Sequence, residues 1–113
     1  MPDNLKPNRP LARARVALAA TQIIAKISQL EGWKLYGDGP EVAIERTFTF
    51  DGFLQTMAFV NAVAFIAERK NHHPELLVQY ARCSVRFRTH DVLGLSITDF
   101  ECAALVDALI TPL

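Results

Sequence analysis

The spacing of apolar residues predicts a helix in the first third of the chain. Apolar side chains recur at intervals of four and three residues, which places them on one helix face; they are Val16, Ala20, Ile23, Ile27 and Leu30. We expect this helix over about residues 11–30, with Gly32 as its stop. Residues 1–10 contain three prolines and cannot hold a helix, so we expect a flexible lead-in there. One domain should then span residues 11–113.

Alternating apolar and polar positions predict strands in two places. A short strand over 33–36 and an alternating segment over 41–50 form the first pair, and residues 76–80 and 82–88 form the second. In the last of these, Cys83, Val85 and Phe87 should face the core while the arginines face away. Arg46 falls on the apolar side of its strand, so we expect either a position near an edge of the sheet or a side chain whose aliphatic stem packs there while its charge reaches water.

A second helix over about 53–70 is apolar nearly all round, and Asp51 is placed to cap it. A surface helix of a small domain keeps a polar face. We therefore expect a homo-oligomer that covers the far side of this helix, a homodimer or homotetramer. The alternative is a helix buried at the centre of the monomer.

Ser96 and Asp99 form a capping-box variant that opens a last helix through about Leu109. Its inward stripe is predicted to be Cys102, Leu105, Val106 and Leu109. The order of elements is helix, two strands, helix, two strands, helix. This order predicts an α+β fold, a four-stranded antiparallel sheet with three helices packed on one face.

Composition narrows the class of protein. The 113 residues carry 12 basic and 12 acidic side chains, which disfavours a nucleic-acid binder, although the row Arg82, Arg86 and Arg88 leaves that reading open. No stretch reaches the ~20 apolar residues of a membrane helix. The two cysteines form no disulfide framework, so we expect a cytoplasmic protein without a membrane or nucleic-acid partner.

All three histidines, His72, His73 and His90, lie in two short segments. Histidine is the side chain whose ordinary pKa, about 6.5, suits proton transfer near neutrality. Adjacent histidines rarely turn toward one ion, and neither a His-x-His nor a His-x-x-x-His pair is present, so we expect no metal site. General acid-base catalysis is favoured, with Glu68 or Asp91 setting the tautomers. Polar loop residues without a catalytic role are the alternative.

The same residues resemble a known family, the pterin-4a-carbinolamine dehydratases. The motif comprises Glu68-x3-His72-His73-Pro74, Tyr80, Thr89-His90-Asp91, Gly94-Leu95 and Asp99, flanked by Gly32-Trp33 and the segment 48–53. The resemblance runs from about Leu11 to Leu109. It implies dehydration of 4a-hydroxytetrahydropterin, which pterin-dependent aromatic amino acid hydroxylases form, to quinonoid dihydropterin, without a cofactor and in support of tetrahydrobiopterin recycling.

The resemblance also implies roles for individual residues. It makes His72, His73 and His90 catalytic, and we assign the proton transfers to His72 and His90 and binding to His73. Substrate contacts by motif match are Asn71, Arg88, Thr89 and Asp91, with Glu68 and Pro74 in support. Five positions depart from the usual pattern and could alter substrate choice or rate: Asn71, Leu76, Leu77 and the pair Val92-Leu93.

A binding function is the competing reading. Some relatives act as dimerisation cofactors of transcription factors, and dehydratase-like proteins can assist assembly of a carbon-fixing carboxylase. Members specialised for assembly generally lose the histidine motif, whereas it is intact here.

Overall fold

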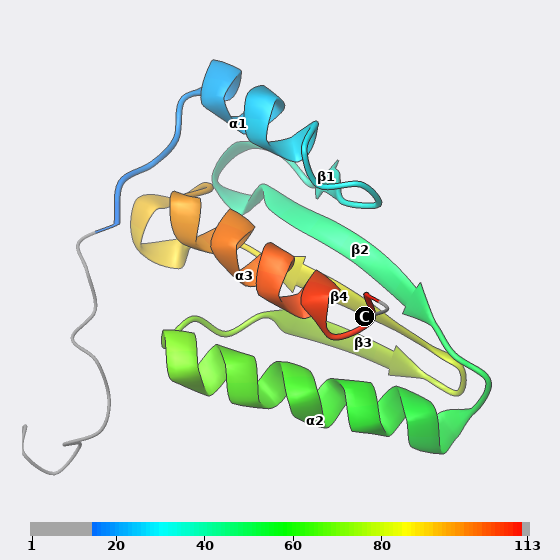
Figure 1. Cartoon of the computed structure of the whole chain (residues 1–113). Coiled ribbons are helices and arrows are strands. Elements are labelled where there is room, and N and C mark those ends of the chain that lie inside the picture. The colour runs from blue at the N-terminus through cyan, green and yellow to red at the C-terminus, as the bar shows by residue number, and fades with distance from the viewer. Residues whose placement is uncertain (1–14, 112–113) are drawn as a thin grey trace, which may run out of the picture.

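A computed structural model describes residues 15–111 (Figure 1). The flexible lead-in expected over residues 1–10 lies outside them. The elements follow the predicted order: α1 (Ala20–Ile27), β1 (Lys34–Tyr36), β2 (Ala43–Thr49), α2 (Phe53–Lys70), β3 (Glu75–Gln79), β4 (Arg82–Phe87) and α3 (Ile97–Ala108). Two short 3₁₀ helices, η2 (Gly39–Glu41) and η3 (His90–Val92), precede β2 and follow β4. The predicted α+β class is confirmed.

The sheet has the strand order β1-β2-β4-β3, and every neighbouring pair is antiparallel (Figure 1). Its inward face carries the predicted apolar set, and Cys83, Val85 and Phe87 are fully buried. The opposite face is polar: Thr47 and Ser84 share a hydroxyl hydrogen bond of 2.7 Å, and Arg86 pairs with Glu45. The helices therefore cover one face only.

Helix α2 has the predicted bounds but not the predicted cap. Gly52 is its N-cap, and the Gln55 side chain accepts a hydrogen bond from the Asp51 amide at 3.0 Å, so the Asp51 carboxylate does not cap the helix. Its inward residues are Thr56, Phe59, Val63 and Ala67. On the far side Leu54 is 85% exposed and Phe65 73% exposed. A helix buried within the monomer is therefore wrong for the part of the chain described here.

Helix α1 begins at Ala20 rather than near residue 11, where we expected it. The Gln22 side chain accepts a hydrogen bond from the Ala19 amide at 2.8 Å and so satisfies the helix start. Residues 15–19 are extended because the Leu18 amide donates to the Leu95 carbonyl at 2.8 Å, a partner far away in the sequence. Local periodicity gives no sign of such a partner.

In α3, the Asp99 carboxylate accepts a hydrogen bond from the Ser96 amide at 2.9 Å, as the capping-box pattern predicts. Cys102 and Val106 pack inward, but Leu105 and Leu109 are exposed, so that half of the predicted stripe is wrong. The buried Asp99 points inward and fixes the rotation of the helix, which turns Leu105 outward; Leu109 lies beyond the last turn.

The end of α3 is fastened to the first half of the chain. Asp107 accepts hydrogen bonds from the Trp33 indole at 3.0 Å and from Arg46 at 2.8 Å. The Arg46 guanidinium lies 4.5 Å from the centre of the Phe48 ring, on the apolar side of β2. Because β2 is an interior strand, the expected position near an edge of the sheet is wrong. No helix within residues 15–111 combines the length and apolar character needed to cross a membrane.

Candidate active site

The two histidine segments meet at one buried carboxylate, that of Asp99. Its Oδ1 lies 2.6 Å from His72 Nε2, and its Oδ2 accepts a hydrogen bond from the Thr89 hydroxyl at 2.8 Å. Thr89 directly precedes His90, so α3 holds both segments at the same end of the sheet. Asp99 is 0% exposed. A buried carboxylate is costly unless donors surround it, and here the Ser96 amide is the third donor.

His72 is placed by the way α2 ends. Asn71 adopts the left-handed conformation, with φ of 50°, and the His72 amide donates back to the Ala67 carbonyl at 3.0 Å. This turn directs the His72 ring inward, where it stacks on Phe87 with a centroid distance of 5.9 Å. His72 is only 5% exposed. Its hydrogen-bonded nitrogen is therefore inside the protein.

His73 and His90 are both exposed. His73 Nε2 lies 2.6 Å from Glu68 Oε2, on the last turn of α2. His90 begins η3, which ends at Leu93 in the left-handed conformation, and the Thr89 amide donates to the Gly94 carbonyl at 3.0 Å to close the loop. The site therefore offers two imidazoles to solvent, and one of them has a carboxylate partner.

The predicted substrate-contact residues have different surroundings. Thr89 is buried, and its hydroxyl is shared between Asp99 and Ser96. Arg88 forms ion pairs with Glu41 at 2.6 Å and Glu75 at 3.1 Å and is largely buried. Asp91 is exposed and faces solvent.

Asn71 and Pro74 form the turn between α2 and β3. Asn71 occupies the left-handed position at the end of the helix, where a short polar side chain is tolerated. Pro74 follows His73 and cannot continue a helix, so the chain passes directly into the strand. Both residues thus shape the backbone that carries the two adjacent histidines.

Sequence reasoning missed the central place of Asp99. Asp99 belongs to the family motif, but its spacing from Ser96 is already explained by a capping box at the start of α3. No local pattern indicates that the Asp99 carboxylate turns inward to bond His72, 27 positions away.

Metal and thiol chemistry gain no support from the side chains. Among residues 15–111, no group of three or more His, Cys, Asp or Glu side chains is arranged to hold a metal ion. Burial raises the pKa of the Cys102 thiol to about 11 and also raises that of Cys83. Because the thiolate is the nucleophile, both cysteines are structural.

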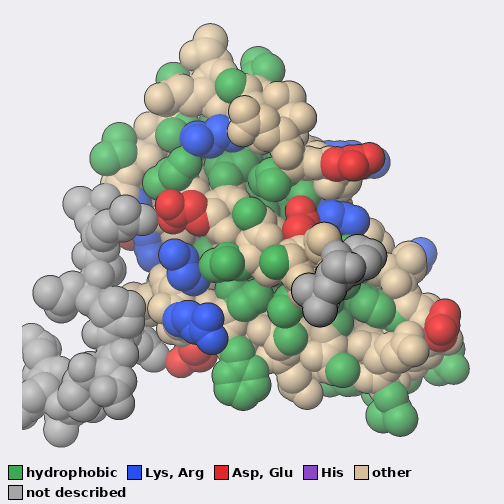
Figure 2. All heavy atoms as spheres, in the orientation of Figure 1, with side chains coloured by type: hydrophobic (Ala, Val, Ile, Leu, Met, Phe, Trp, Pro, Cys, Tyr) green, Lys and Arg blue, Asp and Glu red, His purple; other side chains and the backbone are tan. Residues whose placement is uncertain are grey.

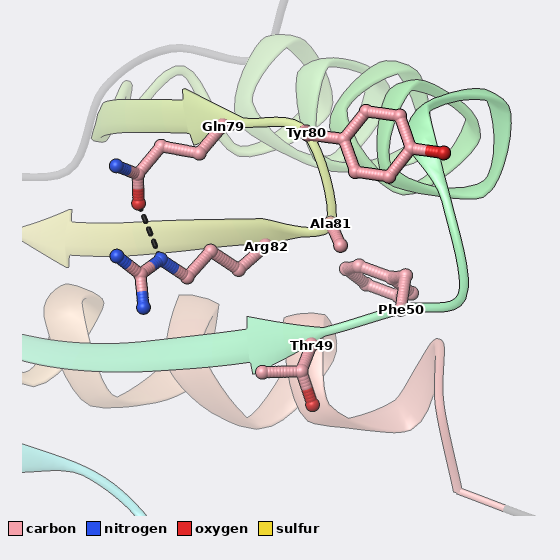
Figure 3. A pocket seen from close by; sticks show the side chains of 6 residues that line it. All are labelled: Thr49, Phe50, Gln79, Tyr80, Ala81 and Arg82. Atoms are coloured by element: carbon pink, nitrogen blue, oxygen red, sulfur yellow. Dashed lines mark hydrogen bonds between the residues drawn. The ribbon is translucent and has the colours of Figure 1, made fainter.

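An open cavity of about 400 Å³ lies at the opposite end of the sheet, around the turn between β3 and β4 (Figure 3). It is lined by Thr49, Phe50, Gln79, Tyr80, Ala81 and Arg82. Figure 3 shows the Arg82 side chain joined to Gln79 by a hydrogen bond. Since both strands run the full length of the sheet from this turn to the histidines, the cavity is separate from the candidate site.

Comparison with known proteins gives the same family by sequence. A sequence model of the family described as pterin 4 alpha carbinolamine dehydratase matches residues 16–109. A Paracidovorax citrulli protein, provisionally named pterin-4-alpha-carbinolamine dehydratase, is 56% identical over 99 residues, covering 88% of this chain and 85% of the relative. A Nitrosospira multiformis protein with the same provisional name is 42% identical over 104 residues, covering 92% and 88%.

Solved structures share the fold. A transcriptional coactivator/pterin dehydratase from Brucella melitensis superposes with a TM-score of 0.79 at 28% identity, over 85% of this chain and all of that one. A pterin dehydratase-like protein described as a RuBisCO assembly factor in the alpha-carboxysome gives a TM-score of 0.59 at 26% identity, over 70% of this chain and 89% of its own. With the family model covering nearly the whole domain and relatives this similar, the chain belongs to the pterin 4 alpha carbinolamine dehydratase family.

Proposed function

We propose that this chain dehydrates 4a-hydroxytetrahydropterin to quinonoid dihydropterin and water. Family membership supplies the reaction. The observation that supports it in this chain is the pairing of His72 and Thr89 with Asp99, because it draws all three histidines to one end of the sheet. The reaction needs an acid for the departing 4a-hydroxyl and a base for the N5 proton, and imidazoles suit both tasks near neutral pH.

Exposure favours a different division of roles from the one that we assigned from the sequence. His73 and His90 reach solvent and can meet a substrate, whereas His72 is almost wholly covered. We therefore propose His73 and His90 for the proton transfers. Glu68 accepts from His73 and fixes its orientation, and His72 on Asp99 supports the loop beneath them.

The other predicted substrate-contact residues also divide into those that can reach the substrate and those that act through their neighbours. We propose that Asp91 and Asn71 flank the substrate, because Asp91 directly follows exposed His90 and Asn71 lies two positions before exposed His73. Thr89 and Arg88 act through their neighbours: the first holds Asp99, and the second ties the start of β3 to η2. No metal or cofactor is required by this scheme.

The test is the decay of enzymatically generated 4a-hydroxytetrahydropterin, followed by ultraviolet absorbance. The wild-type chain should outpace the spontaneous decay. His73→Ala and His90→Ala should each lower kcat by about 10²–10⁴-fold with little change in stability, the usual size of a general acid-base contribution. His72→Ala should also lower the melting temperature, because it leaves the buried Oδ1 of Asp99 without its hydrogen-bond partner. Background decay from folded wild type would refute the dehydratase.

An assembly role is the second candidate, favoured by the fold shared with the RuBisCO assembly factor. Two variants separate the two functions: His73→Ala changes the candidate active site, whereas Arg82→Ala changes the surface far from the histidines. If the protein acts in assembly alone, wild type should show no dehydratase activity, and surface variants should change the result of a partner-binding assay instead.

A functional link to a pterin-dependent hydroxylase follows from the proposed substrate and would appear as faster pterin turnover in a coupled assay.

We further propose a homo-oligomer built on the outer face of α2. Leu54 and Phe65 project from this face, and hydrophobic side chains lie along α2 at the lower edge of Figure 2. Leu77 and Tyr80, on and beside the edge strand β3, are exposed as well. Phe65→Glu should convert a dimer or tetramer to a smaller species by light scattering, whereas Gln55→Glu should not. A wild-type monomer at micromolar concentration would contradict this proposal.

Because Cys83 and Cys102 are free and buried, we also propose that the protein works in the reducing cytoplasm.

A further inference from the structure

An arginine from the segment before α1 joins the two histidine loops. Arg15 Nη2 donates to the Asn71 carbonyl at 2.9 Å, and its Nη1 lies 3.9 Å from Asp91 Oδ2. Asn71 directly precedes His72, and Asp91 directly follows His90. One guanidinium thus spans the backbone of the first loop and a side chain of the second, over 56 positions of sequence to Asn71.

The arginine is held in place rather than mobile at the surface. Its side chain is only 15% exposed. Three residues further on, the Leu18 amide donates to the Leu95 carbonyl at 2.8 Å, and Leu18 packs against the core. The extended segment 15–19 is therefore pinned beside the loop that follows His90, which aims Arg15 at the gap between the loops.

The chemistry of both contacts suits a cation. Asn71 closes α2, where backbone carbonyls point out of the helix and its dipole presents negative charge. Asp91 adds a carboxylate on the other side. A planar guanidinium has two separate nitrogens that can reach partners some distance apart, whereas a lysine ammonium must place both partners around a single nitrogen.

We propose that Arg15 is a positioning residue that sets the distance between the His72-His73 loop and the His90 loop. This inference rests on the proposed dehydratase function. Asp99 joins the same loops from inside the protein, and Arg15 joins them from the outside. Proton transfer from two loops to one substrate depends on their separation, and a displacement of about 1 Å can lower a rate by roughly 100-fold.

The experiment compares Arg15→Ala and Arg15→Lys with two controls. Val16→Ala alters the same segment at an exposed side chain, and Arg82→Ala removes an arginine at the far end of the sheet. Arg15→Ala should lower kcat by about 10- to 100-fold with a smaller change in KM, and Arg15→Lys should recover part of the loss. Both controls should stay within about twofold of wild type, the size of an ordinary surface change.

Amide hydrogen exchange provides a readout that needs no substrate. In Arg15→Ala, exchange should quicken in residues 71–75 and 89–95 and stay unchanged in the turn over 79–82. Unchanged exchange in both loops would overturn the proposal, as would faster exchange with full activity. An inactive wild type would instead refute the dehydratase function, and the exchange result alone would then decide whether Arg15 holds the loops.

Discussion

Replacing Asp99 with asparagine tests the centre of the site, because the change keeps the shape and removes the charge. The carboxylate accepts from His72 Nε2 at 2.6 Å, from the Thr89 hydroxyl at 2.8 Å and from the Ser96 amide at 2.9 Å. The asparagine carbonyl can replace Oδ2 and keep the last two bonds. Its amide group then faces His72 with a donor, where the imidazole needs an acceptor.

The cost follows from the loss of the charged acceptor and from the change of imidazole tautomer that the asparagine amide imposes. A hydrogen bond to a charged group contributes about 1.5–3 kcal/mol, so Asp99→Asn should destabilise the fold by about 2 kcal/mol. In a domain of this size that corresponds to a fall of roughly 8–16 °C in the melting temperature. Asp99→Ala should cost about 3–5 kcal/mol, because it strands all of these donors inside the protein.

Urea denaturation measures this directly, since Trp33 is the only tryptophan and is buried in the core. Protein concentration is held fixed so that oligomerisation does not shift the midpoint. Asp38→Asn, at an exposed carboxylate without a capping bond, is the matched control and should stay within about 0.5 kcal/mol.

Nitrogen NMR of the His72 ring supplies the second readout. Wild type should carry its hydrogen on Nε2, and Asp99→Asn should move it to Nδ1, because the asparagine amide offers a hydrogen where the carboxylate accepted one. A cost below about 0.5 kcal/mol for Asp99→Asn, or an Nδ1 hydrogen in wild type, would refute the reasoning.

Three further predictions test other parts of the structure. Glu68→Gln should lower kcat about 10- to 100-fold, since His73 loses its negatively charged acceptor. It should leave the urea midpoint almost unchanged because the pair is exposed, and equal activity would contradict the pairing. Gly32→Ala should cost about 1–2 kcal/mol in thermal unfolding, because φ is +91° and a Cβ would lie 2.8 Å from Arg46 Nε; unaltered stability would contradict both the backbone strain and the close approach of Arg46. Both thiols should resist a thiol reagent at about pH 8 until urea unfolds the protein. The pKa of Cys102 is raised to about 11 by burial, so its contribution to stability is full below the ordinary thiol value of about 8.5 and is lost as the pH approaches 11. The urea midpoint should therefore fall over that range, and less so in Cys102→Ala.

The sequence by itself determined the elements whose signals are local. The alternation of Cys83, Val85 and Phe87 identified the inward face of β4, because successive side chains of a strand point to opposite faces. Helix α2 was predicted with its observed bounds, since a long apolar run ends at Asn71 and Pro74. The motif around His72, His73 and His90 identified the family, because adjacent histidines and a third one beyond a hairpin are local patterns.

Only the tertiary structure decided which histidines face solvent and what joins their loops. His72 is covered because it meets Asp99, 27 positions away, and Arg15 meets Asn71 across 56 positions. The same kind of long-range contact, between Leu18 and Leu95, delays the start of α1 to Ala20. Periodicity reports which face of an element is apolar, but the partner of a polar side chain depends on how the elements pack, and that is set by the whole chain at once.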